Sequence, residues 1–306
     1  MCVLYRHAFP FLFIFGVIQK KMMTAKVRIG GVPEHFNYSW HKMIEEGLLD
    51  DISVHWIDCP GGTGAMAQGI HEGELDIAIM LTEGAVAAIA KGCPARIAHF
   101  AVDSPLVWGI HTGAKSDLHV EQDVKGKTFA ISRYGSGSHL MAIVHAAQQG
   151  WSLEHMKWLE VKNLDGAKKA LVSGEADVFL WERFTTKPLV DEGSFRLLGL
   201  LPTPWPAFVV VVSNAFMVQH ASHFYRISEK ILAVQKNIVK EKDLSSIISN
   251  RYQLKKVDVE VWLKSTKWSS SNEISEASIE PVIETLKNNN ILNNSSLSNF
   301  LVLSKE

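Results

Sequence analysis

Two series of alternating strands and helices are joined by one long apolar segment, and this arrangement restricts the fold more than any other feature. Strand patterns such as AKVRIGG and ELDIAIML alternate with helical patterns over residues 25–92, and the alternation restarts after residue 125. Residues 97–112 lie between the two series and have no helical period. Strands that alternate with helices predict parallel, doubly wound sheets. We therefore expect an α/β fold with two lobes.

The second series begins at the strand KTFAIS and is followed by a helical C-terminal part. FRLLGL and FVVVVSNAF are expected to be two separate strands, the second returning to the first lobe, and residues from about His220 form amphipathic helices. Ligands of open α/β sheets bind beyond the carboxyl ends of the strands, so a cleft between the lobes is the expected site. The helices of the second series are expected over residues 138–149, 164–173 and 184–190.

Composition is that of an ordinary globular protein and excludes some classes of function. The chain has 306 residues, of which 47% are hydrophobic and 21% charged, with a formal net charge of -1. A nucleic-acid footprint needs clustered basic residues, so we expect no nucleic-acid partner. The three cysteines, Cys2, Cys59 and Cys93, are too few and too scattered for a disulfide framework or a zinc site.

The first 22 residues form an N-terminal extension that does not enter the fold argument. An apolar run from Ala8 to Ile18 is shorter than the roughly 20 residues that span a bilayer. It could be the centre of a signal peptide, but Gln-Lys-Lys follows it instead of a small-residue cleavage site. We favour a start at Met22 or Met23 and a cytoplasmic protein, with export to the periplasm as the alternative. Neither includes a stable membrane span.

The loop RYGSGSHLMA joins a strand to a helix and has the composition of an anion pocket. Free N–H groups and the helix dipole favour negative charge at a helix N-terminus. Gly137 allows close approach of the backbone, and Arg133 could pair with a carboxylate, sulfonate or phosphate. Ser136, Ser138 and His139 complete the predicted contacts. The alternative is a tight turn that Ser138 caps, with Arg133 in solvent.

The turn PGGTGAMA in the first lobe could likewise be either an anion-binding loop or only a tight turn. Gly62, Thr63 and Gly64 follow a strand and open a helix, so they are expected to contact the ligand. The turn also matches the dinucleotide fingerprint loosely, but it follows the second strand instead of the first, and its helix is short. We therefore expect no cofactor.

Further cleft candidates lie at other strand ends. If Glu83 faces the cleft, it suits an ammonium or a ring N–H, and the tryptophan face of Trp181 could stack on a flat ligand. The alternatives are that Thr82 caps a helix, that Glu83 is solvated in its first turn, and that Asp103 only forms a turn. The complete set of these candidates is Phe36, Asn37, Thr82, Glu83, Asp103, Ser104 and Trp181.

The order of the motifs resembles that of the type II periplasmic substrate-binding proteins. KVRIGG, GGTGAM, GELDIAIML, GKTFAISRYGSGSHLMA and GEADVFLWE follow one another as in that family, over residues 25 to about 290. The sequence is most similar to the branch that handles nitrate, sulfonates, taurine and thiamine precursors. A subgroup without clear export signals, known from bacteria and from yeasts such as Candida, is nearer still.

The resemblance implies a two-lobed clamp that closes by a hinge motion at its crossing strands. Residues 23–108 plus 211–306 would form the first lobe, and residues 109–210 the second. An ABC permease would be the partner if the protein is exported. The resemblance places the loop after the first strand, Gly62–Gly64, the Thr82 region and Ser136–His139 in the cleft.

Enzymatic chemistry is not expected. The chain has no Gly-x-Ser-x-Gly elbow and no Walker loop. The fungal thiamine-pyrimidine synthases of the same family carry a lysine and a histidine where Met80 and Gly84 stand here, and the return strand PAFVVVVSNAF lacks their cysteines. We expect no catalytic residue and no metal site. The expected function is binding of a small organic anion or zwitterion, and the alternative is a cytosolic enzyme or sensor, for example in thiamine-precursor metabolism.

Overall fold

The computed structural model describes residues 25–49, 51–292 and 300–302, and the N-terminal extension lies outside them. Within this part, the strands form one mixed eight-stranded sheet with the order β2-β1-β3-β8-β4-β7-β5-β6. The strands are β1 (Ala25–Gly31), β2 (Ile52–Asp58), β3 (Ile77–Leu81), β4 (Ala95–Gly113), β5 (Thr128–Ile131), β6 (Lys157–Glu160), β7 (Val178–Glu182) and β8 (Phe195–Ser213).

Helices follow most strands, as the alternation predicts, and a helical C-terminal part completes the fold. The predicted helix over residues 164–173 is confirmed residue for residue as α5. The helices are α1 (Tyr38–Glu45), α2 (Gly62–His71), α3 (Thr82–Ala90), α4 (Gly137–Gln148), α5 (Leu164–Ser173), α6 (Arg183–Asp191), α7 (Asn214–Ile238), α8 (Leu244–Tyr252), α9 (Lys256–Ser265) and α10 (Glu276–Asn288), with 3₁₀ turns η1 (His35–Asn37), η2 (Glu121–Val124) and η3 (Leu153–His155).

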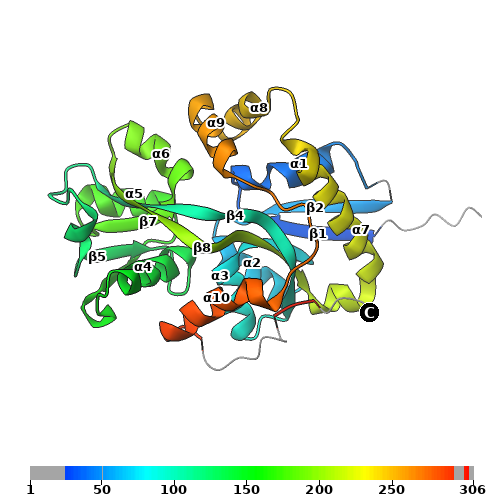
Figure 1. The fold of residues 1–306 in the computed structure, drawn as a ribbon, viewed down its shortest axis with the longest axis horizontal. Coiled ribbons are helices and arrows are strands. Elements are labelled where there is room, and N and C mark those ends of the chain that lie inside the picture. The colour runs from blue at the N-terminus through cyan, green and yellow to red at the C-terminus, as the bar shows by residue number, and fades with distance from the viewer. Residues whose placement is uncertain (1–24, 50, 293–299, 303–306) are drawn as a thin grey trace, which may run out of the picture.

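Two lobes share this sheet, as Figure 1 shows. One lobe is built on β1, β2 and β3, the other on β5, β6 and β7, and the long strands β4 and β8 run through both. Parallel pairs occur within each lobe, whereas β3–β8, β4–β7 and β4–β8 are antiparallel. The predicted type II α/β fold is confirmed. The predicted lobe boundaries at residues 108 and 210 fall inside the two crossing strands and stay a prediction.

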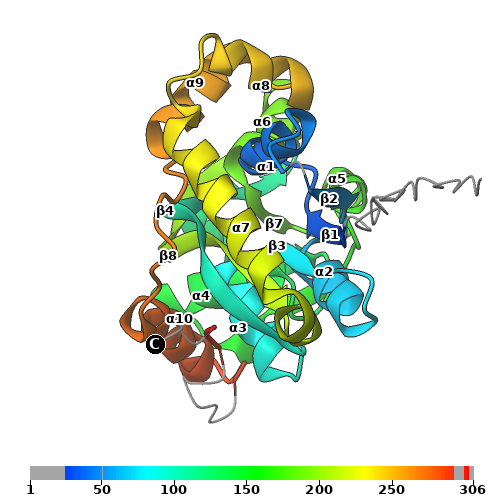
Figure 2. The same ribbon diagram turned by 90° about the vertical axis from the view of Figure 1, so that its right-hand side faces the viewer.

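The connections place helices on both faces of the first lobe. The chain moves from β1 outward to β2 through α1, and then back past β1 to β3 through α2. Because such crossovers are right-handed, opposite directions of travel place α1 and α2 on opposite faces. α7 packs against α1, while α3 and α10 pack together on the side of α2 (Figure 2).

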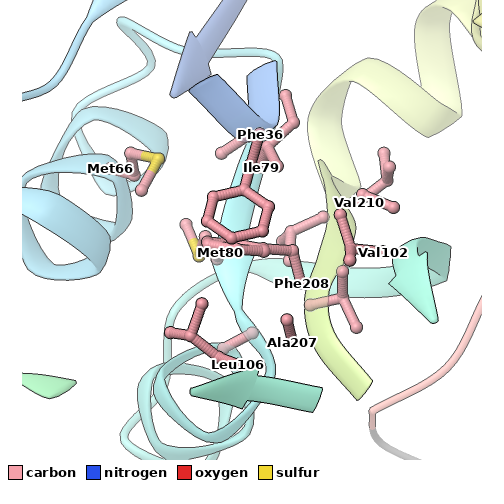
Figure 3. Packing of buried hydrophobic residues seen from close by; sticks show 14 of the residues in the cluster. Phe36, Met66, Ile79, Met80, Val102, Leu106, Ala207, Phe208 and Val210 are labelled. Carbon is pink, nitrogen blue, oxygen red and sulfur yellow. The ribbon is translucent and has the colours of Figure 1, made fainter. Parts of the chain in front are cut away.

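The core of the first lobe follows from the fully apolar strands. Ile77, Ile79 and Val210 are buried on β3 and β8, as expected for strands covered on both faces. Figure 3 shows the ring of Phe36 beside Met80 and Phe208 in this core. Trp40 on α1 also belongs to the core and is only 1% exposed.

One prediction about the strands is wrong: FRLLGL and FVVVVS belong to the single strand β8, which ends at Ser213, and the following Asn214 begins α7. Pro202, Pro204 and Pro206 lie between the two segments. Prolines at alternate positions all turn their nitrogens to the same side of a strand, and their fixed φ is compatible with extended backbone. The strand therefore continues through them, although its ladder to β4 has register shifts between Phe100 and Val107.

That irregular stretch lies where the two lobes meet. Register shifts interrupt the ladder between neighbouring strands and bend them locally. Three of the five register shifts in the β4–β8 pair fall in this stretch, which suits a hinge between lobes. None of the helices within residues 25–49, 51–292 and 300–302 is long and apolar enough to cross a bilayer.

Candidate functional site

A cavity of about 60 Å³ lies between the lobes. One water needs about 10–15 Å³ of such space, so the cavity can admit a small ligand. It is lined by Val32, Glu34, Pro60, Gly61, Gly62, Thr63, Met66, Leu81, Leu106, Trp108, Ser132, Arg133, Ser136, Gly137, Ser138, Lys162, Trp181, Glu182 and Phe208.

Three serines at the start of α4 form a connected hydroxyl cluster on the cavity wall. The Ser138 hydroxyl accepts from the Ser132 backbone N–H at 2.9 Å and lies 3.0 Å from the Ser136 hydroxyl. All three side chains are buried. The alternative interpretation that Ser138 caps the helix is wrong, since Ser136 occupies the N-cap position. The first-turn N–H groups have no acceptor within α4, so hydroxyl and backbone donors gather at this wall.

Arg133 enters the cavity from the second lobe and reaches the first lobe. Its Nη1 donates to the Gly61 carbonyl oxygen at 3.3 Å. A Cβ on Gly64 would overlap the guanidinium, so Arg133 lies directly against α2. Burial lowers the pKa of Arg133, whose charge is nevertheless retained at neutral pH. The arginine thus lies between the two lobes instead of in solvent.

Aromatic side chains form the apolar part of the wall. Trp108 and Trp181 meet edge to face with ring centroids 6.4 Å apart, and Phe208 lies across the cavity from the first lobe. The indole N–H groups of both tryptophans are buried without an acceptor in the part of the chain that the structure describes. Unsatisfied buried donors cost free energy, so an acceptor atom on a ligand would stabilise this site.

Two carboxylates complete the wall. Glu34 follows β1 and Glu182 ends β7, so they come from different lobes. Burial raises the pKa of Glu34 to about 8, with a further contribution from the negative charge of Glu182. Burial also raises the pKa of Glu182 to about 6. Lys162, in the left-handed region at φ 69, contributes a second cation to the lining.

Seven of the predicted contact residues line this cavity: Gly62, Thr63, Arg133, Ser136, Gly137, Ser138 and Trp181. Of the others, Phe36 packs on Phe208 with centroids 5.0 Å apart, and the Asn37 amide donates to the Val32 carbonyl oxygen at 2.7 Å. His139 accepts from the Gly135 N–H at 3.0 Å. Gly64 lies in an outer groove beneath Arg133.

Four further candidates do not line this cavity and instead make hydrogen bonds or ion pairs within the protein. The Thr82 hydroxyl donates to the Pro206 carbonyl, which differs from the helix-capping alternative. Glu83 is fully buried, and its Oε2 accepts from the Trp205 indole N–H at 2.9 Å. Asp103 lies 3.3 Å from the ammonium of Lys267, and the Ser104 hydroxyl accepts from the Lys267 N–H.

Glu34, Lys162, Glu182 and Trp108 line the cavity but were not among the predicted contacts. Glu182 ends β7, and Glu34 lies in the loop after β1, which ends at Gly31; these positions are a signal that sequence could have supplied. Trp108 lies within the long strand β4, where an apolar run does not distinguish core from cavity. Lys162 has an unusual backbone conformation that becomes visible only in three dimensions.

Comparisons with known proteins agree with this architecture. Residues 108–201 match the family model described as Ca3427-like PBP. No match is found among curated proteins. Among solved structures, the CA3427 gene product of Candida albicans, described as defining a new family with the generic periplasmic binding protein fold, is 24% identical with a TM-score of 0.84. The alignment covers 90% of this chain and 96% of that chain.

Two further structures are less similar. The alkanesulfonate-binding protein SsuA from Xanthomonas axonopodis pv. citri, bound to MOPS, is 18% identical with a TM-score of 0.75, covering 88% of this chain and 95% of that chain. PhnD1 from Prochlorococcus marinus, in complex with methylphosphonate, is 13% identical with a TM-score of 0.63, covering 88% and 100%. These comparisons confirm the predicted type II fold, and the family model over residues 108–201 agrees with the predicted resemblance to the Candida-type subgroup.

Proposed function

We propose that this chain, a periplasmic-binding-protein-like protein with the type II fold, binds a small organic anion or zwitterion between its lobes, without catalysis. The observation that carries the proposal is the cavity between the lobes, in which the Ser132–Ser138 loop places hydroxyl and backbone donors beside Arg133. Sulfonates, phosphonates and carboxylates are the anions that such donors suit. The role of a solute-binding protein for an ABC transporter belongs to the same proposal.

The comparisons support this choice of ligand class. One similar structure is an alkanesulfonate-binding protein and another holds methylphosphonate. The cavity of about 60 Å³ favours ligands of few heavy atoms over nucleotides or cofactors. The residues proposed to contact the anion are Arg133, Ser136 and Ser138, with Trp108 and Trp181 around its apolar part.

Replacing Arg133 with alanine is expected to weaken anion binding by at least about 1.5 kcal/mol, the lower end for a charged hydrogen bond. The change removes a cation from the cavity wall and also its contact with the Gly61 carbonyl oxygen. Isothermal titration calorimetry with methanesulfonate and methylphosphonate measures the loss. Lys157→Ala, an exposed lysine of the same lobe, is the matched control. Unchanged affinity in Arg133→Ala would remove this residue from the site.

A further inference from the structure

Glu34 and Glu182 place two carboxylates of opposite lobes on one cavity wall. Three donors converge on Oε2 of Glu182: the N–H of Phe184 at 3.0 Å, the N–H of Thr185 at 2.7 Å and the Thr185 hydroxyl at 2.9 Å. They fix this carboxylate at the start of α6, and none of the three is shared with Oε1. Glu34 precedes η1, but its side chain makes no capping hydrogen bond to that turn.

The surrounding protein offers the pair no direct counter-charge. Within residues 25–49, 51–292 and 300–302, neither carboxylate takes part in an ion pair within 4.0 Å. Arg251, which borders a neighbouring hollow together with Glu34, is engaged by Glu45 at 2.7 Å. The charged or titratable groups around the pair are Arg133 and Lys162 in the cavity, Arg183 beside Glu182, and His35, His41, Asp58 and Arg251 on the outer side of Glu34.

Two carboxylates that share a small, poorly hydrated space are not both ionised at neutral pH. Burial raises the pKa of Glu34 to about 8, with a smaller contribution from the negative charge of Glu182, and burial raises the pKa of Glu182 to about 6. Near pH 7 the ligand-free pair therefore holds about one proton. His35 adds no charge there, because burial lowers its pKa to about 3.

We propose that Glu34 and Glu182 form a cation subsite of the cleft, which takes an ammonium group or a protonated ring nitrogen of the ligand and gives up its proton to solvent. This inference rests on the proposed function, since the anionic end of the same ligand meets the Ser132–Ser138 loop. It narrows the ligand to a short zwitterion. No covalent bond changes: the ligand's cation replaces one carboxylic proton, which leaves as a hydronium ion or on buffer.

Two probes of equal length test the subsite. 2-Aminoethanesulfonate carries an ammonium group where 2-hydroxyethanesulfonate carries a hydroxyl group. Calorimetric titrations at pH 8 are expected to show at least about tenfold tighter binding of the amino compound. Its affinity is expected to rise by up to about tenfold per pH unit between pH 6 and 8, because each binding event releases a proton. Titrations in buffers of different ionisation enthalpy should count about one proton released at pH 7.

Two variants separate the subsite from the anion pocket. Glu34→Gln and Glu182→Gln are each expected to abolish the preference for the amino compound and its pH dependence, while the hydroxy compound still binds. Glu154→Gln, an exposed glutamate of the second lobe, is the control and should behave as the wild type. Glu34 lies in a partly exposed loop, so Glu34→Gln remains informative even if the change at the buried Glu182 impairs folding.

The outcomes are distinguishable. Equal, pH-independent affinity for the two sulfonates would overturn the cation subsite and leave the proposed function intact. Binding of neither compound, nor of the corresponding phosphonates and carboxylates, would overturn the proposed function and the subsite with it. If both glutamine variants still bind the amino compound more tightly than the hydroxy compound, the ammonium group binds elsewhere, and this result would also overturn the assignment.

Discussion

Glu83→Gln is expected to stabilise the protein by up to about 3 kcal/mol at pH 9 and to have almost no effect near pH 4.5. Glu83 is fully buried at the start of α3, and burial raises its pKa to about 7 from an ordinary value of 4.5. The folded protein thus binds this proton more tightly than the unfolded chain. The stability that the protonated form contributes is complete below pH 4.5 and is lost as the pH rises through about 7.

Glutamine avoids the buried charge and keeps a carbonyl oxygen for the Trp205 indole N–H, which donates to Oε2 of Glu83 at 2.9 Å. Urea unfolding of wild type and variant at several pH values measures the difference, and subtraction cancels the titration of groups common to both. Glu280→Gln, an exposed glutamate on α10, is the control for loss of a carboxylate. A stability difference that does not grow with pH would contradict the buried charge at Glu83.

Gly137→Val is expected to weaken ligand binding by about five- to 150-fold, since overpacking of a close contact costs about 1–3 kcal/mol. Gly137 begins α4 at the cavity wall, where a Cβ would lie 2.6 Å from Cδ1 of Leu81 and 2.8 Å from Cη2 of Trp108. Leu81 belongs to the first lobe. A branched side chain at position 137 therefore both fills the cavity and separates the lobes.

Calorimetry with the tightest-binding sulfonate measures this loss, and small-angle X-ray scattering should report a larger radius of gyration for the variant. Gln148→Val, at the exposed end of the same helix, controls for the helix propensity of valine. Wild-type affinity in Gly137→Val would mean that the ligand does not bind against α4.

Local sequence patterns were sufficient to predict the helices and strands but not every connection between them. Periodicity predicted both ends of α5 correctly, because its buried apolar residues Ala167, Ala170 and Leu171 recur at helical spacing. The continuity of β8 through three prolines was missed, since it depends on pairing with β4, about 100 residues away in the chain.

The lining of the cavity was predicted best where one loop carries several of its groups. Arg133, Ser136 and Ser138 meet in the cavity because α4 begins there, which the glycine and serine pattern already indicates. Glu34 and Glu182 come from different lobes, so their separation in sequence hides the pair. Glu83 was expected near a ligand or in solvent, and its burial against Trp205 reflects how α3 packs on the crossing strand.

The most direct test of cleft binding is thermal unfolding of the wild type and of Gly137→Val with a panel of small ligands. The panel holds short alkyl sulfonates, aminosulfonates, phosphonates, carboxylates, nitrate, thiamine pyrimidines and NAD(P). A ligand at 100 times its Kd adds about 2.7 kcal/mol to stability, so a clear shift is expected for a short anion or zwitterion in the wild type and a much smaller one in Gly137→Val. A shift with NAD(P) alone, or an equal shift in both proteins, would contradict binding of a small anion in the cleft.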